Sequence, residues 1–170
     1  MPLNHSLNVF LSNFFHKLRL KIKPECCISN TFKNQNNTKT NKMKRENILT
    51  GSPWEDKMGY CRAVRIGNII EVSGTVALVD GEKVKADDAF AQTLNILERI
   101  EKVLEDLNVG MKDVIRTRIF TTDITTFEDV ARAHATFFKD IKPTTGFYEV
   151  SKLVAPEYLV EIEFTAVVAG

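Results

Sequence analysis

The stretch that decides the fold is PTTGFYEVSKLVAPEYLVEIEFTAVVAG, residues 143–170, because its second half alternates between apolar and polar side chains. Side chains alternate across a strand every two residues, so one face of this strand should enter a core. The other face carries Glu161 and Glu163, roughly 7 Å apart. Two interpretations remain open: ordinary ion pairs on a solvated face, or a proton-handling carboxylate at a subunit boundary. The apolar face is formed by Val160, Ile162, Phe164, Ala166 and Val168.

The chain before this stretch predicts a sheet interrupted by two helices. Strands are expected at residues 47–50, 60–66, 69–75 and 114–121, with Gly67-Asn68 as a hairpin turn. Apolar residues at helical spacing predict a helix over residues 87–107, with Asp87 as its N-cap. Thr125 to Glu128 has the spacing of a capping box and predicts a second helix ending near Phe138. Pro143 prevents that helix from continuing.

This order of elements predicts one α+β domain over residues 43–170. Two amphipathic helices would cover one face of a mixed sheet, and the other face would stay uncovered. Such a domain is consistent with an oligomer, although composition does not show one.

Several short motifs resemble the RidA family, the reactive-intermediate (enamine/imine) deaminases. The family typically carries Pro-Ala-Arg, then Glu-Val, then a strand with Glu-Ile-Glu. The matching positions here are Pro143-Thr144-Thr145, Glu149-Val150 and Glu161-Ile162-Glu163. The resemblance extends upstream through Met58-Gly59-Tyr60, Val72-Ser73-Gly74, Ala91-Gln92-Thr93, and Arg118-Ile119-Phe120 with Asp123. Each motif alone is weak, but their common order across residues 48–168 makes the resemblance strong.

The resemblance implies a chorismate-mutase-like fold and a homotrimer with small-molecule clefts between its subunits. It implies hydrolysis of imines and enamines, such as 2-aminoacrylate, to a keto acid and ammonia, with no metal or organic cofactor. Carried over to this chain, Glu161 would orient the attacking water and Tyr60 would line the cleft. Gly74 would offer backbone groups to the substrate. The equally simple structural roles are an ion-pair partner, a packed aromatic ring and a flexible strand end.

The sequence departs from the family pattern at this same site. Thr145 replaces the arginine that grips the substrate carboxylate, and Phe147 stands where the family often has cysteine. Losing one charge-assisted hydrogen bond weakens binding by about 10- to 100-fold. We therefore expect either a hydrolase with an altered substrate or a non-catalytic trimer that binds a small molecule.

Another cation could replace the missing arginine. Arg62 should share a strand face with Tyr60, and Arg118 should share one with Val114 and Phe120. Either guanidinium could bind the substrate from a new direction. The alternative is that both form ion pairs with glutamates, such as Glu161, Glu163 or Glu149.

Charge and composition divide the chain and limit its partners. Residues 1–42 carry seven basic and one acidic residue, whereas residues 43–170 carry 16 basic and 21 acidic residues. An acidic domain argues against nucleic-acid binding, and no apolar run is long enough to cross a membrane. His134 is the only histidine in residues 43–170, so a zinc site is not expected. The three cysteines form no disulfide pattern, which favours a cytoplasmic location.

Residues 1–42 allow three interpretations. Their apolar residues recur at helical spacing and are followed by basic residues, as in an organelle-targeting presequence, for example a mitochondrial one. The segment could instead be a disordered extension before Met43, or a helix that lies on a membrane surface.

Overall fold

The computed structural model describes residues 43–79, 81, 82 and 84–169, which form a six-stranded sheet with three α-helices. The predicted extension or presequence, residues 1–42, lies outside the described residues. The elements in chain order are β1 (Arg45–Ile48), α2 (Pro53–Met58), β2 (Ala63–Ile66), β3 (Ile69–Val76), α3 (Ala89–Asp106), β4 (Val114–Thr121), α4 (Phe127–Phe138), β5 (Thr144–Glu149) and β6 (Val160–Val167).

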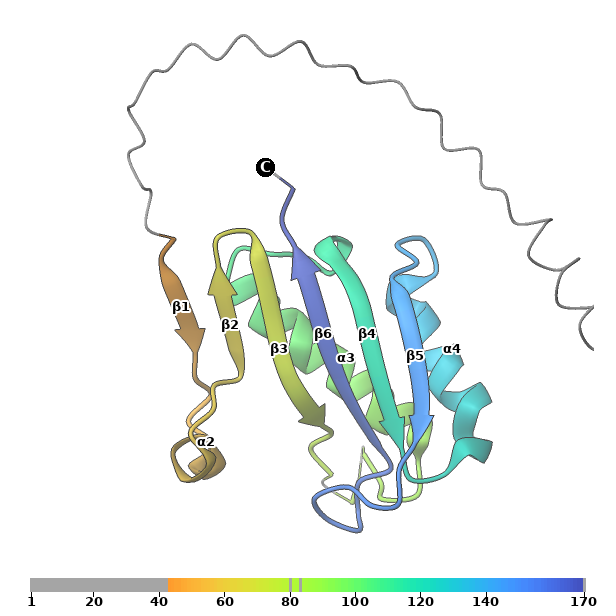
Figure 1. The fold of residues 1–170 in the computed structure, drawn as a ribbon. Coiled ribbons are helices and arrows are strands. Elements are labelled where there is room, and N and C mark those ends of the chain that lie inside the picture. Colours follow the sequence, from red (N-terminus) through yellow and green to blue (C-terminus); the bar gives the residue numbers. More distant parts are fainter. Residues whose placement is uncertain (1–42, 80, 83, 170) are drawn as a thin grey trace, which may run out of the picture. The chain divides into compact units, whose positions relative to one another are not determined.

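The sheet is mixed and has the order β1-β2-β3-β6-β4-β5. Only β4 and β5 run parallel, and α4 makes the crossover between them. Figure 1 shows α3 and α4 together behind the same face of the sheet. The predicted α+β architecture, with two helices on one face, is therefore confirmed.

The core lies between the helices and the sheet. The apolar set of β6 predicted from its alternation is fully buried from Val160 to Ala166 at every second residue. From α3, the fully buried residues are Ile96, Leu97, Ile100 and Leu104, and they pack in the same cluster. Burying one such aliphatic side chain contributes about 1.5–3 kcal/mol, so this layer dominates the stability of the domain.

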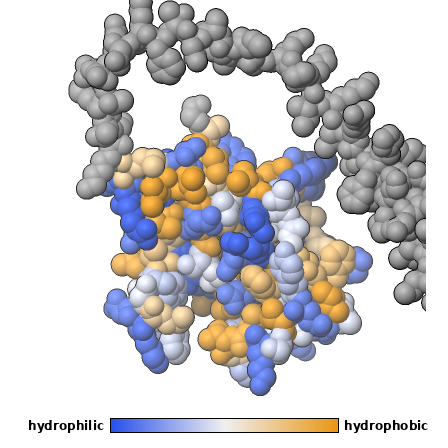
Figure 2. Space-filling model, viewed as in Figure 1, coloured by the Kyte–Doolittle hydropathy of each residue, from blue (hydrophilic) through white to orange (hydrophobic). Residues whose placement is uncertain are grey.

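The opposite face of the sheet carries the remaining side chains of the strands. Figure 2 views this face, on which hydrophobic and hydrophilic side chains both gather. Along β6 it presents Glu161, Glu163 and Thr165, which are half-buried. Among the described residues, no helix is both long and apolar enough to span a membrane.

Some predicted boundaries were wrong at the ends of elements. The strand predicted from Tyr60 begins only at Ala63, because the backbone N–H of Tyr60 bonds the Glu55 carbonyl and closes α2 instead. Asp88, not Asp87, caps α3, and its side chain accepts from the Ala91 N–H at 2.8 Å. The short helix α2 was missed, because six residues are too few for a periodic pattern.

The predicted face of β4 also needs a correction. A register shift between Val114 and Arg116 turns Val114 into the core, where it is 3% exposed. Arg116, Arg118 and Phe120 remain on the uncovered face, opposite Thr165, Glu163 and Glu161 of β6. A bulge changes which residues of a strand share a face, and no residue pattern in β4 indicates one.

Candidate functional site

Four of the predicted site residues come together where β3 ends. Strands β3, β4 and β5 end at the same edge of the sheet, at which β2 and β6 begin (Figure 1). Tyr60, Arg62, Gly74 and Glu161 are linked there by contacts described below. We call these residues, together with Arg99, the β3-end cluster.

The Glu161 carboxylate lies directly against the backbone of Gly74. A Cβ atom added to Gly74 would lie 1.8 Å from Glu161 Oε1, so only glycine leaves room for the carboxylate here. The register shift in β3 between Val72 and Thr75 produces this close approach. Burial raises the pKa of Glu161, the neighbouring Glu163 raises it further, and the charge of Arg62 partly opposes both effects. A half-buried carboxyl with a raised pKa takes up a proton more readily than an exposed one, which suits a general base.

Arg62 is buried to 8% exposure and holds the parts of the cluster together. Its Nη1 donates to the Gly74 carbonyl at 2.7 Å and to Thr75 Oγ1 at 3.0 Å. Its Nη2 donates to the Tyr60 hydroxyl at 3.3 Å, and the guanidinium lies 5.7 Å from the Tyr60 ring centre. Its Nε has no hydrogen-bond partner among the described residues, although it is buried. Arg62 thus joins the α2–β2 loop to the end of β3.

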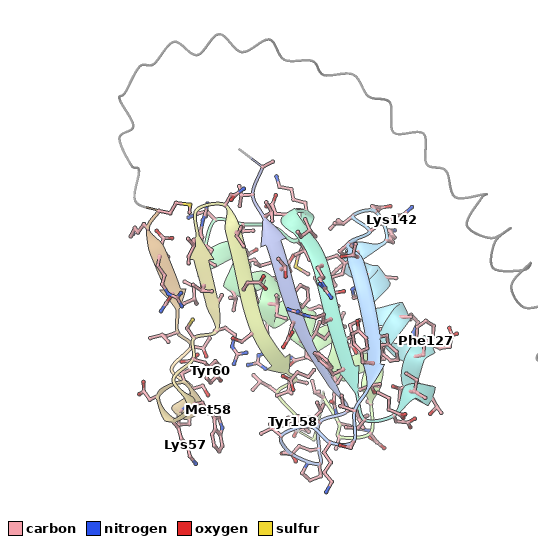
Figure 3. All side chains as sticks on the ribbon, viewed as in Figure 1. Lys57, Met58, Tyr60, Phe127, Lys142 and Tyr158 are labelled. Carbon is pink, nitrogen blue, oxygen red and sulfur yellow. The ribbon has the colours of Figure 1, made fainter. Side chains whose placement is uncertain are left out.

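Arg99 enters the same cluster from α3, and it was not among the predicted site residues. Its Nη1 donates to the carbonyl of Val76, the last residue of β3. Burial lowers the pKa of Arg99, and the charge of Arg62 lowers it further, whereas Tyr158 opposes these effects. Figure 3 shows Tyr60 and Tyr158 at the same end of the sheet. One arginine on an amphipathic helix carries no signal in the sequence, because only the packing of α3 on β3 brings it here.

Arg118 lies elsewhere on the uncovered face and is paired. Its Nε lies 2.8 Å from Glu163 Oε2, and both side chains are about one-third exposed. This is one of the ion pairs that the sequence analysis offered as the alternative to ligand binding. A binding role for Arg118 stays a prediction.

Thr145 and Phe147 lie on the helix side of the edge strand β5. Thr117 Oγ1 donates to Thr145 Oγ1 at 3.0 Å and lies 3.2 Å from His134 Nε2 of α4. Thr145 Oγ1 in turn donates to the Pro143 carbonyl. We call His134, Thr117 and Thr145 the threonine–histidine chain. Within one subunit, the structure does not bring Thr145 to Glu161, because the two face opposite sides of the sheet.

Aromatic side chains flank the threonine–histidine chain. Phe147 meets Phe127 edge to face, with ring centres 5.4 Å apart. The His134 ring lies 4.5 Å from the Phe138 ring. Burial lowers the pKa of His134 to about 4, so the imidazole is neutral at physiological pH.

Gln92 explains the Ala91-Gln92-Thr93 motif structurally. This fully buried amide donates to the carbonyls of Lys85, Ala86 and Glu157, and its Oε1 accepts from the Leu159 N–H at 2.9 Å. Gln92 therefore ties α3 to the loop that carries Tyr158. Its role is to hold the rim of the β3-end cluster.

No other candidate site among the described residues contains the predicted site residues. Among residues 43–79, 81–82 and 84–169, no group of three or more His, Cys, Asp and Glu side chains is placed to bind a metal ion. A surface pocket of about 370 Å³ opens between strands β1 and β2 and the end of α3. None of the predicted site residues lines that pocket.

The sequence matches the family model described as Endoribonuclease L-PSP over residues 53–168, which is more than half of the chain. The chain belongs to this family. The RidA resemblance is thereby confirmed at the level of the family, and the matched region contains every residue of the β3-end cluster.

Relatives in the Endoribonuclease L-PSP family carry different descriptions. The chain is 32% identical to the 3-aminoacrylate deaminase RutC of Acinetobacter baylyi over 73% of this chain and 98% of that protein. It is 29% identical to a RutC family protein of Pyrococcus abyssi, over 73% and 98% respectively. The crystal structure of Rv2704 from Mycobacterium tuberculosis, a member of the YjgF/YER057c/UK114 family, is 42% identical with a TM-score of 0.68. That match covers 74% of this chain and 100% of Rv2704.

Proposed function

We propose that this chain hydrolyses a small imine or enamine to a carbonyl compound and ammonia, without a cofactor. The observation that carries the proposal is Glu161, a half-buried carboxyl with a raised pKa that is seated on the Gly74 backbone. The deaminase description of the Acinetobacter baylyi relative supports the same class of reaction.

The reaction needs one water and one proton-transfer group. In the proposed step, the Glu161 carboxylate takes a proton from water as the water oxygen bonds to the imine carbon. The proton is returned to the nitrogen, which gives a carbinolamine. Glu161 then takes the hydroxyl proton and passes it to the amine, the C–N bond breaks, and ammonia leaves as the carbonyl forms. Such general base catalysis contributes about 10²- to 10⁴-fold. Tyr60, held by Arg62, lines the same space.

The substrate is expected to differ from 2-aminoacrylate because Thr145 provides no positive charge. A hydroxyl that already donates to the Pro143 carbonyl is a weak substitute for a bidentate guanidinium. If the family arrangement of a homotrimer applies, Thr145 of one subunit and Glu161 of the next would share one cleft. We include this trimer, and a cytoplasmic location, in the proposal. Sedimentation equilibrium would test the trimer by giving three times the chain mass of 19.3 kDa.

A direct assay tests the proposed reaction. Imines are generated in situ from several amino acids, and keto-acid release is followed with and without the purified protein. Acceleration of at least one imine over buffer is expected, and it should be lost in Glu161→Gln. If no imine is accelerated, while a keto acid still raises the melting temperature, the chain is the non-catalytic binding protein.

Thr145→Arg is the companion experiment. If the rest of the cleft is intact, the added guanidinium should raise activity toward 2-aminoacrylate by about 10- to 100-fold. No gain would mean that the cleft has diverged beyond this residue.

RNA cleavage, which the family description also names, is not the function we propose. Residues 43–170 are net acidic, and a phosphate-binding surface needs clustered positive charge. Their only histidine, His134 of α4, is held neutral by burial against β4.

A further inference from the structure

Two guanidinium groups occupy an open strand edge at the end of β3. The last residue of β3 that pairs with β2 is Val72, opposite Ala63. Beyond it, the Gly74 carbonyl accepts from Arg62 and the Val76 carbonyl accepts from Arg99. These two carbonyls are two residues apart on one strand, roughly 7 Å. The arginines thus stand side by side where a neighbouring strand has ended.

Neither guanidinium has a carboxylate partner among the described residues. The ion pairs in this part of the chain are Lys44–Glu46, Arg118–Glu163 and Arg132–Asp129. Arg62 Nε is buried and has no hydrogen-bond partner, and Arg62 as a whole is more than nine-tenths buried. Buried charges in proteins are normally paired. The charge of Arg62 acts on Glu161 without forming an ion pair, and no carboxylate acts on Arg99, so a bound anion would complete the site.

We infer that Arg99 binds the carboxylate of the substrate, with Arg62 behind it as a positioning residue. Arg99 is only half-buried, so it can contact a ligand, and its bond to Val76 leaves Nη2 and Nε free to donate. Arg62 is too buried to be a main contact. It adds positive charge and holds Tyr60 and the Gly74 backbone in place.

The register of the sheet places this carboxylate site beside the proposed base. Val76, whose carbonyl anchors Arg99, is the cross-strand partner of Glu161. Gly74, whose carbonyl accepts from Arg62, lies against the Glu161 carboxylate, so both arginines are at the same end of the sheet as the proposed base. The substrate that fits is an imine with a carboxylate bound from this new direction and with a side chain other than that of 2-aminoacrylate. For the reaction, this inference rests on the proposed function. The binding of a carboxylate by Arg99 can be tested independently of that reaction.

Binding of 2-oxo acids and of a neutral ester tests the inference. Pyruvate, 2-oxobutanoate and methyl pyruvate are titrated by calorimetry into the full-length wild type, Arg99→Gln, Arg99→Lys and Arg132→Gln. Arg99→Gln should weaken both acids by about 10- to 100-fold and leave the ester unchanged. Arg99→Lys should retain part of the affinity. Arg132→Gln removes the same charge from an exposed site on α4 and should bind both acids like wild type.

The outcomes separate this inference from its rivals. If Arg99 only caps the edge of β3, Arg99→Gln lowers the melting temperature but does not change the preference for acid over ester, and the inference is wrong. It is also wrong if no carboxylate binds the wild type, or if the ester binds as tightly as pyruvate. If Arg99→Gln loses acid binding but the wild type hydrolyses no imine, the carboxylate site stands and the proposed reaction fails.

Discussion

The β3-end cluster and the threonine–histidine chain are both groups of polar side chains in a packed sheet. They differ in whether their charges and hydrogen-bond donors have partners. In the threonine–histidine chain, the Thr117 hydroxyl donates to Thr145 and the Thr145 hydroxyl donates to the Pro143 carbonyl. His134 must therefore donate from Nε2. The threonine–histidine chain is then neutral, and each of its donors has an acceptor. In the β3-end cluster, neither Arg62 nor Arg99 forms an ion pair with a described residue, and the Glu161 carboxyl is partly desolvated.

This difference indicates a structural role for the threonine–histidine chain and a functional role for the β3-end cluster. A closed, neutral chain can stabilise the fold but has nothing further to offer a ligand. An arrangement with unmatched charge costs stability and is functional where a substrate supplies the missing partner. We therefore expect changes in the cluster to affect activity, and changes at His134 to affect stability in acid.

Glu161→Gln should have the largest effect. Imine hydrolysis is expected to fall about 10²- to 10⁴-fold, because the general base is removed. The raised pKa means that folded Glu161 binds its proton more tightly than unfolded Glu161, so its ionised form destabilises the fold at neutral pH. The variant should therefore unfold at higher urea than wild type at pH 7. The gain should fade as the pH falls through the raised folded pKa, and it should be absent below the unfolded value of 4.5.

Glu163→Gln is the matched control for that experiment. It removes the same charge from the same face of β6. The ion-pair partner of Glu163 is Arg118, and Glu163 acts on the cluster only through the pKa of Glu161. Its activity should stay within about threefold of wild type, since surface ion pairs contribute about 0–1 kcal/mol. Equal losses in both variants would contradict a special role for Glu161.

Gly74→Ala should have the next largest effect. The new Cβ would meet Glu161 Oε1, which is the end of a flexible side chain, so the carboxylate can rotate away and the fold can survive. Displacing a catalytic group by about 1 Å can cost about 10²-fold, so kcat should fall by about 10- to 100-fold with little change in melting temperature. A large loss of melting temperature would show that Gly74 serves the backbone and not the carboxylate.

His134→Gln should change stability in acid without a large effect on activity. The pKa of His134 is lowered from 6.5 to about 4, so the unfolded chain binds the proton more tightly. The contribution of neutral His134 to the free energy of unfolding is complete above pH 6.5 and is lost as the pH falls toward 4. Between pH 7 and pH 4 the wild type should lose about 2 kcal/mol more than the variant, allowing for partial exposure. Parallel urea-unfolding midpoints over this range would contradict the prediction.

Arg118→Ala should have the smallest effect. Its pair with Glu163 is about one-third exposed, so the free energy of unfolding should fall by less than about 1 kcal/mol. Pyruvate affinity should not change in a calorimetric titration. A loss of affinity comparable to that of Arg99→Gln would move the carboxylate site to the middle of the uncovered face.

The sequence predicted the layers of the fold because alternation in β6 and helical spacing in α3 both reflect burial. It did not predict the two register shifts, in β3 and β4, because a bulge depends on pairing with another strand. The same limit applies to the site. Glu161, Gly74, Arg62 and Tyr60 followed from a motif or from parity, whereas Arg99 becomes visible only once α3 packs on β3. The side of β5 on which Thr145 lies likewise depends on pairing with β4.

The buried amide of Gln92 has a consequence for motion around the β3-end cluster. The Leu159 N–H lies one residue before β6, yet it donates to a side chain fixed in the core of α3. Its hydrogen exchange should therefore be as slow as that of the central strands, since opening it requires α3 to move. The loop that carries Tyr158 is then a fixed wall and not a lid. A ligand would reach Arg99 through a preformed entrance, and its association rate should be insensitive to solvent viscosity beyond simple diffusion.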